Sequence, residues 1–543
     1  MRIMKRINLL YIVLTALSLS SCSDFLDTLP DNRAEMNSAE KVTSLLVSAY
    51  ADHAPIMLME FGTDNVMDNG SEFPVRYQGH ENTYLWKDIP TTDNDDPKAV
   101  FESYYKAIAS ANQALKSIEE LGDPASLAPY KGEALLCRAY SHFTLANVFC
   151  LPYNPETADK DMGLPYAISP ETTPFVAYER GTMAQLYEQI NKDIEEALPL
   201  ISDDAYTVPK YHFNRKAAYA FAARFNLFYV HTDKSNYQKV IDYATIALGN
   251  QPASMVRNFT KYLPLGAEDI KNAYVQASEP ANFLIMPAYS AMARLLGSYG
   301  KRYGHSRPVI TYETMWAGGP WGTNGSSGFL ISKAYGSDQA VRFPKLDEFW
   351  EETDKVAQTG FAHIVTVPFT ADETLLCRAE AYVFKERYDE AAADLNIWQV
   401  ARCKESVTIG GKLMNLQTLT PEIINNFFQN RKYCPVVSTS ASGNDRTIKK
   451  QLHPQGFTVA EGEQENFIQC ILHFRRLEGL HDGLRWCDIK RYGIEVGHNR
   501  EGLPADILKS DDPRRAIQLP ADVITAGLQA NPCLLYTSDA ADD

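Results

Sequence analysis

Apolar residues recur at helical spacing along most of this chain, and the pattern occurs more than once. The clearest unit begins at Asn214, a residue type that caps helix N-termini, and its apolar stripe runs to residue 228. After a polar break, a second stripe runs from Tyr237 to Leu248 and stops at Gly249. Alanine contacts and an aromatic residue at the start of the second helix are typical of a tetratricopeptide (TPR) unit. The pattern therefore predicts two antiparallel helices.

Two further stretches repeat this pattern. The sequence Thr370-Ala-Asp-Glu373 is a capping box that begins a second helical pair. The stretch from Glu133 to Ala139 is nearly the same string as the one from Glu373 to Ala379, so it predicts a third pair. Its partner helix starts only after a proline-rich loop, at another capping box that begins with Thr182. Because insertions separate these units, they predict a scaffold within one body rather than a regular solenoid.

Residues 251–368 have a different composition, because the helical period fades and glycine, serine and aromatic residues dominate. Residues 318–320, Gly-Gly-Pro, are typical of turns. A long loop-rich insert with many aromatic residues favours a functional segment over a disordered one. We therefore expect a mostly α-helical body over residues 22–532, divided into an N-terminal part (22–250), the insert, and a C-terminal part (369–532).

The start of the chain predicts export and lipidation. A basic head precedes an apolar run that is too short to cross a bilayer, as in a secretory signal peptide. The run ends in Leu19-Ser20-Ser21-Cys22, which resembles a bacterial lipobox that is cut before its cysteine. We expect residues 1–21 to be a lipoprotein signal peptide and Cys22 to carry the lipid anchor outside the cytoplasm. The alternative is an ordinary signal peptide that contains a cysteine by chance.

Composition excludes some partners and chemistries. The net charge of −16 argues against binding to nucleic acid or to an anionic surface. Seven cysteines between the two ends are scattered without disulfide-framework or zinc spacing, so we expect them to be buried and structural. Residues 533–543 resemble a translated sequencing adapter, and we expect them not to belong to the natural protein.

Several motifs together resemble the SusD/RagB family of outer-membrane nutrient-uptake lipoproteins. They extend from Cys22 to Pro532, and the sharpest is Arg475-Arg476-Leu477-Glu478 followed by residues 482–491, Asp-Gly-Leu-Arg-Trp-Cys-Asp-Ile-Lys-Arg. Phe474 and Asp482 depart from the family pattern, which commonly has glutamate at both positions. Without invoking function, we expect the charged signature residues, and equally Arg138 and Arg378, to form structural ion pairs, with partners such as Glu478.

The resemblance implies a SusD-like, TPR-containing fold and a lipid-anchored position on the outer membrane, facing the cell exterior. It also implies a partner, a SusC-like TonB-dependent outer-membrane barrel, with the TPR face against it. Family members capture oligosaccharides or, in some cases, peptides, and pass them to the transporter without chemistry. A lipid-anchored TPR scaffold that binds protein partners is the alternative from a different functional class.

The sequence contains no catalytic, metal or cofactor motif, so we expect a binding protein rather than an enzyme, with no cofactor. Sugar rings need flat apolar faces flanked by polar groups. The insert supplies Tyr312, Trp316, Trp321 and Asn324 as candidates, and a region where family members often contact ligand supplies Asp64, Asn65, Arg76, Tyr77 and Trp86. Glycine and proline neighbours predict poor burial of Trp316 and Trp321. The alternative is that these aromatic residues only pack the insert onto the scaffold.

Overall fold

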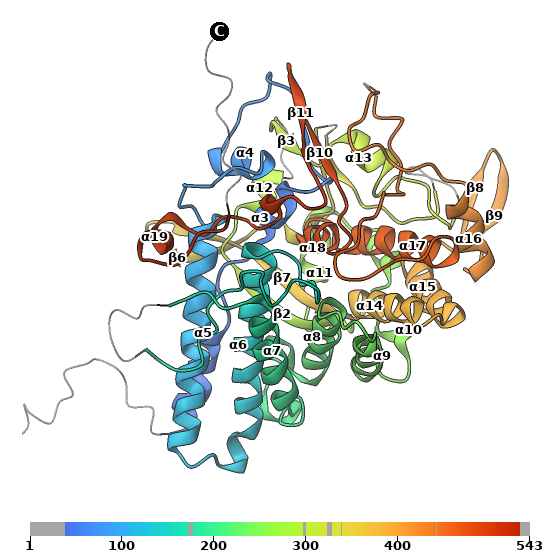
Figure 1. The fold of residues 1–543 in the computed structure, drawn as a ribbon. Coiled ribbons are helices and arrows are strands. Elements are labelled where there is room, and N and C mark those ends of the chain that lie inside the picture. The colour runs from blue at the N-terminus through green and yellow to red at the C-terminus, as the bar shows by residue number, and fades with distance from the viewer. Residues whose placement is uncertain are drawn as a thin grey trace, which may run out of the picture.

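The computed structural model describes residues 38–171, 178–296, 300–322, 328–337, 339–440 and 442–532. The fold is mostly α-helical, as predicted (Figure 1). Its first helices are α2 (Ala39–Leu46), α3 (Ile56–Phe61), α4 (Gln78–Tyr84), α5 (Pro97–Glu120), α6 (Ala128–Phe149) and α7 (Met183–Ala197). Helix α6 packs between α5 and α7. Cys22, Asn324, the predicted signal peptide and residues 533–543 lie outside the described residues.

The predicted helical pairs are confirmed. They are α8 (Arg215–Phe228) with α9 (Ser235–Leu248), α14 (Ala371–Phe384) with α15 (Tyr388–Arg402), and α6 with α7. The side chains of Asn214, Thr182 and Thr370 cap their helices as expected. The box at Thr182 is reciprocal, whereas the side chain of Glu373 turns instead to two buried arginines.

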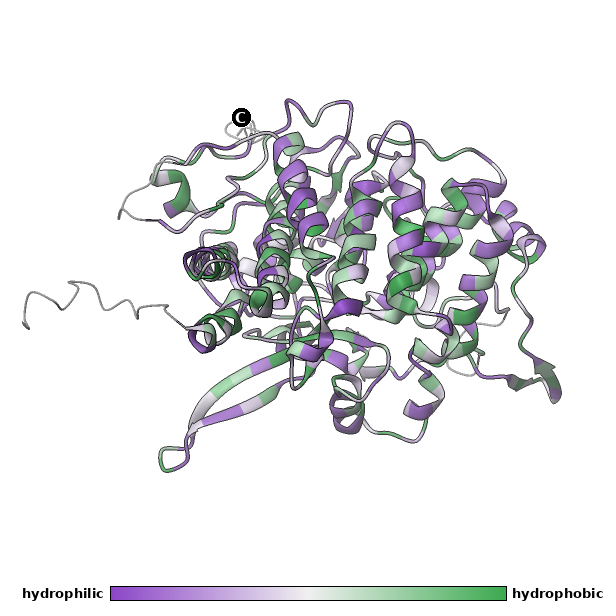
Figure 2. Cartoon of the chain, turned by 90° about the horizontal axis from the view of Figure 1, so that it is seen from below, coloured by the Kyte–Doolittle hydropathy of each residue, from purple (hydrophilic) through white to green (hydrophobic). Residues whose placement is uncertain are grey.

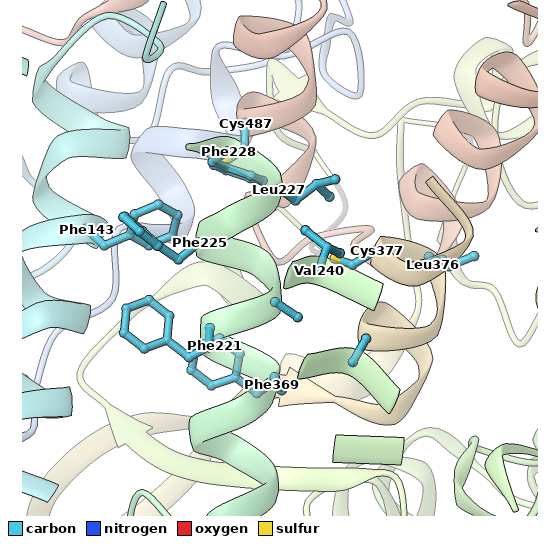
Figure 3. Packing of buried hydrophobic residues seen from close by; sticks show 14 of the residues in the cluster. Phe143, Phe221, Phe225, Leu227, Phe228, Val240, Phe369, Leu376, Cys377 and Cys487 are labelled. Atoms are coloured by element: carbon cyan, nitrogen blue, oxygen red, sulfur yellow. The ribbon is translucent and has the colours of Figure 1, made fainter. Parts of the chain in front are cut away.

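Packing between the pairs creates the main hydrophobic core (Figure 3). Phe143 of α6 lies 5.7 Å from Phe221 and 5.8 Å from Phe225, both on α8, measured between ring centroids. Phe369 packs on Phe221 from the other side, at 5.6 Å. These aromatic contacts place α8 at the centre of the molecule, between the α6–α7 pair and α14.

The insert contains strands that the sequence pattern did not reveal. Strands β2 (Asn282–Ala288), β7 (Thr359–Thr370) and β6 (Phe349–Asp354) form an antiparallel sheet in the order β2-β7-β6. Short two-stranded pairs are β1 (Met67–Asp68) with β3 (Tyr303–Gly304), β4 (Tyr335–Ser337) with β5 (Ala340–Arg342), β8 (Ser406–Ile409) with β9 (Lys412–Asn415), and β10 (Val496–Arg500) with β11 (Leu503–Leu508). Short helices of this region are α10 (Pro252–Met255), α11 (Ala267–Tyr274), α12 (Met292–Leu296) and α13 (Arg307–Tyr312).

The C-terminal signature lies on buried helices that pack against the repeats. The C-terminal helices are α16 (Pro421–Gln429), α17 (Glu463–Glu478), α18 (Leu484–Arg491) and α19 (Ala521–Thr525). Arg475 of α17 contacts Asp488 at 3.0 Å, and Arg491 of α18 contacts Glu380 of α14 at 2.5 Å. The prediction of structural pairing is therefore confirmed. Glu478, however, pairs with Arg402 and accepts a hydrogen bond from the Trp398 indole.

The cysteine prediction is also confirmed for the described residues. All seven are free and buried: Cys137, Cys150, Cys377, Cys403, Cys434, Cys470 and Cys487. Burial raises the pKa of the Cys137, Cys377 and Cys470 thiols well above the ordinary value, as expected of inert core residues. Among the helices in the described part of the chain, none is both long and apolar enough to span a bilayer.

Candidate functional site

The structure brings together the two segments that supply the candidate binding residues. One is the early loop, which contains Asp64 to Trp86, and the other is the insert. Strand β1, which follows Asp64 and Asn65, pairs with β3 of the insert. Arg302 binds Asp68 through two hydrogen bonds of 3.0 Å each, and Ser306 donates to the Asn69 side chain at 2.6 Å. Backbone pairing and a bidentate ion pair therefore fix the loop after α3 against the start of α13.

A buried charge network lies beneath this junction. Arg485 of α18 holds both carboxylate oxygens of Asp64, at 2.9 and 2.8 Å. Arg476 of α17 donates to the Asn65 side chain and to Glu313, each at 2.8 Å. Asp64 and Asn65 therefore have intramolecular partners, and the contacts join the early loop, the insert and both signature helices.

Cations outnumber carboxylates in this network, and they control its electrostatics. Burial alone would raise the pKa of Asp64, but the charges of Arg476, Arg485 and Lys450 hold it well below its usual range. The pKa of Glu313 is lowered in the same way, against the effect of burial, by Lys450 and Arg476 among others. Both carboxylates are consequently ionised in the folded protein.

Trp86 belongs to a stack of side chains that crosses the molecule. Its indole lies 4.2 Å from the His498 ring, which lies 3.9 Å from Tyr84, and Tyr84 stacks on Tyr303 of the insert at 4.5 Å, between ring centroids. The Arg514 guanidinium covers the outer face of Trp86 at 5.4 Å from its centroid. Both faces of the indole are thus occupied, which gives Trp86 a packing role in this structure.

A pocket of about 460 Å³ lies at the edge of this stack. Its wall includes Trp86, Trp486, Arg514, Gln518 and Asn531. The Trp86 indole donates to the Gly62 carbonyl at 3.0 Å, whereas the buried Trp486 indole nitrogen has no hydrogen-bond partner among the described residues. The volume is within the range of small-molecule sites.

The expectation that Trp321 is poorly buried is wrong. Trp321 is 3% exposed and packs on Trp398, His473 and Phe474. Its indole folds back over Gly319, where an added Cβ would lie 2.3 Å from the ring. The glycine therefore makes room for the ring beside the core, and does not turn it toward solvent.

Trp316 and Tyr312 are half-buried, at the C-terminal end of α13 and the turn that follows it. The Trp316 amide donates to the Ile310 carbonyl at 2.7 Å, and the Arg307 guanidinium lies 5.9 Å from the Trp316 ring centroid. Among the described residues, the Tyr312 hydroxyl has no hydrogen-bond partner. These three residues form what we call the α13 face, which combines aromatic surface with polar groups.

Sequence reasoning missed the polar loop that borders the α13 face. Gly443 approaches Pro308 of α13 so closely that an added Cβ would lie 2.8 Å from the proline Cβ. Arg446, at the end of the same loop, binds Glu313 at 2.6 Å. Ser442 and Asn444 of this loop are exposed, and Ser440 is half-buried. The Ser-Gly-Asn-Asp composition of residues 442–445 signals a loop, but no local pattern indicates that Glu313, 133 residues before Arg446, is its neighbour.

Tyr77 and Arg76 lie on the surface of the early loop. The Tyr77 hydroxyl donates to Asp96, and its ring packs on His80 at 4.8 Å. Arg76 is exposed. Burial lowers the pKa of Lys301, and the charge of Arg76 adds to this effect, so the two cations face each other across the junction with the insert. Tyr77 is anchored within its own loop, whereas Arg76 is presented to solvent.

The arrangement suits binding by stacking and hydrogen bonding. Half-buried aromatic rings, an arginine and a serine-rich loop are the groups that contact sugar rings and their hydroxyls. In the described ranges, no group of three or more histidine, cysteine, aspartate or glutamate side chains is placed to hold a metal ion.

Comparison with known proteins finds a matching family model. Residues 24–227 match the SusD-like family model described as starch-binding and associating with the outer membrane. No curated protein sequence matches the chain.

Solved structures share the fold along nearly the whole chain. A SusD superfamily protein from Bacteroides vulgatus is 19% identical, with 90% of this chain and 97% of that chain covered and a TM-score of 0.57. One from Bacteroides thetaiotaomicron is 18% identical, with 91% and 98% covered and a TM-score of 0.52. A SusD-like carbohydrate binding protein from Bacteroides vulgatus is 15% identical, with 87% and 88% covered and a TM-score of 0.52. The chain therefore matches a SusD-like family model over residues 24–227 and shares its fold with solved SusD superfamily proteins.

Proposed function

We propose that this protein is a lipid-anchored lid on the cell exterior that captures an oligosaccharide and delivers it to a TonB-dependent outer-membrane transporter, without catalysis. The observation that carries the proposal is the match of residues 24–227 to a starch-binding family associated with the outer membrane. The structural likeness to a carbohydrate binding protein supports the same class of ligand.

The α13 face is the glycan site that the geometry supports best. Trp316 and Tyr312 retain accessible ring surface, whereas Trp321 and both faces of Trp86 are covered. A sugar ring stacked on Trp316 would lie beside Arg307 and near the serine-rich loop. A sugar ring needs only one free face of an aromatic ring to stack on, so a half-buried indole can bind it. Asp64 and Asn65 would support the site from beneath through the charge network.

Calorimetry of the lipid-free chain from Ser23 onward against soluble polysaccharides, oligosaccharides and peptides tests the proposal. We expect one glycan to bind, and Trp316→Ala or Tyr312→Ala to abolish or strongly weaken that binding with the fold intact. The control is Trp350→Ala, which removes an exposed tryptophan on β6, away from the α13 face. Binding that survives loss of Trp316 and Tyr312 would refute this location of the site. Binding of peptides alone would refute the glycan as cargo.

Two further measurements address the anchor and the partner. Labelling with a fatty-acid analogue should reach the wild-type chain and not Cys22→Ser. A large barrel encoded beside this chain should co-purify with it from detergent-solubilised outer membranes. A chain that is secreted without lipid, or that never associates with such a barrel, would refute the corresponding half of the proposal.

A further inference from the structure

The hairpin of β6 and β7 extends from the body as an arm, residues 350–362 (Figure 2). Its base is firmly anchored. Phe349 stacks on His363 with 5.8 Å between ring centroids, and the Lys271 ammonium lies 4.4 Å from the Phe349 centroid. Glu348, just before β6, forms an ion pair with Arg294 at 2.7 Å. The arm is therefore a fixed projection of the sheet.

The tip of the arm is a defined turn. The Asp354 carboxylate accepts hydrogen bonds from the backbone N–H groups of Val356 at 2.8 Å and Ala357 at 3.0 Å. Gln358 has a left-handed backbone with φ of 51°. These contacts hold Val356 outward, and 96% of its surface is exposed. An apolar residue is thus presented at the end of an ordered element.

Two aromatic residues are exposed along the arm. Trp350 is 59% exposed and Phe361 is 56% exposed. Trp350 is opposite Ala362 and Phe361 is opposite Glu351, so the two rings point to opposite faces of the hairpin. Trp350 lies across Gly360, where an added Cβ would be 2.9 Å from the indole. Apolar surface on both faces and at the tip of one projecting element is typical of an interaction site.

Strand β6 also offers an open edge with a distinct charge. In the sheet order β2-β7-β6, its outer edge pairs with no strand in the described parts of the chain. Such an edge can accept one more strand through backbone hydrogen bonds. The arm has a net charge of −2, because it contains three carboxylates, on Glu351, Glu352 and Asp354, and one cation, Lys355. Acidic side chains on the edge oppose pairing with a second copy and favour a basic segment.

We propose that this arm docks a basic, extended segment of a partner protein, which adds to β6 as a fourth strand. Backbone hydrogen bonds would supply the pairing, and Trp350 would contact apolar side chains on one face of the segment. The carboxylates would select lysine or arginine at the positions between them. The proposal is independent of glycan binding, since the arm contributes no residue to the α13 face.

A pair of synthetic peptides tests the arm directly on the full-length chain in mild detergent. One ten-residue peptide alternates lysine or arginine with valine, threonine and tyrosine, and its counterpart carries glutamate at each basic position. We expect the basic peptide to bind at least about tenfold more tightly, with the difference shrinking as salt rises. Hydrogen–deuterium exchange of residues 349–362 should slow when the basic peptide binds, because strand addition covers the edge.

Variants locate the contact. The triple variant Glu351→Lys/Glu352→Lys/Asp354→Lys should reverse the preference between the peptides, and Trp350→Ala should weaken binding by about tenfold. Leu413→Ala is the matched control, because Leu413 is 64% exposed on a different hairpin, β8–β9. Circular dichroism and thermal melting establish that each variant is folded, and Trp316→Ala should bind the peptide as the wild type does.

Four results would overturn the proposal. They are equal affinity for both peptides, unchanged affinity in the triple variant, self-association through the arm in ultracentrifugation, and binding of the arm to lipid vesicles in place of the basic peptide. None of these results bears on glycan binding, which the calorimetry with Trp316→Ala measures separately. Failure of one proposal is therefore distinguishable from failure of the other.

Discussion

The ion pair of Arg485 and Asp64 is almost fully removed from water, with side chains 2% and 9% exposed. Without Arg485, the Asp64 carboxylate loses two hydrogen bonds and keeps Arg476 and Lys450, at 3.3 and 3.2 Å. We therefore expect Arg485→Ala to lower the free energy of unfolding by about 1.5–3 kcal/mol. Urea denaturation followed by circular dichroism measures this loss.

A surface pair provides the control for this prediction. Lys98 contacts Asp522 at 2.8 Å, but both side chains remain largely exposed. Lys98→Ala should change the free energy of unfolding far less than Arg485→Ala does, because solvent screens the surface pair. If Arg485→Ala costs no more than Lys98→Ala, the charge network does not hold the junction together.

Trp321 gives a second test at the scale of single residues. Its ring packs on Trp398 and Phe474 in the core, so Trp321→Ala should open a cavity and cost about 3–5 kcal/mol. Trp316→Ala, five positions earlier and half-buried, should cost much less. Equal losses of stability in the two variants would contradict the different environments of the two indoles.

At the scale of elements, the same ion pair recurs in two helical pairs. Arg138 of α6 binds Asp193 of α7 through hydrogen bonds of 2.6 and 2.7 Å. Arg378 of α14 binds Asp394 of α15 through hydrogen bonds of 2.8 and 2.7 Å. Both arginines lie in the repeated Leu-Leu-Cys-Arg-Ala string. The same bidentate link between two helices therefore occurs in both helical pairs.

A double-mutant cycle tests whether this link acts as a unit. Arg378→Met should cost about 3–5 kcal/mol because Asp394 is then buried without its partner. The double variant Arg378→Met/Asp394→Leu should recover most of that loss, since it removes both charges and fills the space. Denaturation of the two single variants and the double variant gives the coupling energy. Additive losses would show that the two side chains do not depend on each other.

Local patterns predicted the helices but not the contacts between distant segments. The stripe after Asn214 and its stop at Gly249 are properties of neighbouring residues, so periodicity and caps were sufficient. The pairing of β2 with β7 joins residues about 80 positions apart, and Asp64 meets Arg485 across 421 positions. No local signal encodes these separations. Expecting Glu478 as a partner was reasonable from helical proximity, but tertiary packing gave it to Arg402.

The site was predicted only in outline for the same reason. Sequence composition pointed to the early loop and the insert, and the β1–β3 pairing places these two segments side by side. Which aromatic ring remains accessible depends on packing, however. Gly319 makes room for Trp321 beside the core, and Arg514 and His498 cover Trp86 from segments more than 400 residues away.

At the scale of the whole molecule, buried histidines link stability to pH. Burial lowers the pKa of four of them to about 3, namely His80, His142, His305 and His481. An unfolded chain has histidines that titrate near 6.5. Between these values the unfolded state binds more protons than the folded state, so stability rises with pH and is lost as pH falls below about 6.5.

Two buried acids oppose this effect. Burial raises the pKa of Asp95 to about 6 and also raises the pKa of Glu60. Near pH 5 the folded state therefore holds a proton on Asp95 that the unfolded state has released, and Glu60 acts in the same direction. The buried histidines with lowered pKa, which also include His473 and His498, outnumber the two acids, so acidification lowers the stability overall. The lowered pKa values of Asp64 and Glu313 add a further loss only below about pH 4.

Urea midpoints at pH 7.0, 6.0 and 5.0 measure this dependence, and we expect the midpoint to fall steadily across the series. His305 shows why: one ring nitrogen faces the Val341 carbonyl and the other faces the Thr314 hydroxyl, each at 2.8 Å, and burial of the ring disfavours its charged form. His305→Gln should therefore reduce the slope by about 1.4 kcal/mol per pH unit. A midpoint that stays constant from pH 7.0 to 5.0 would mean that the buried histidines titrate alike in the folded and unfolded chains.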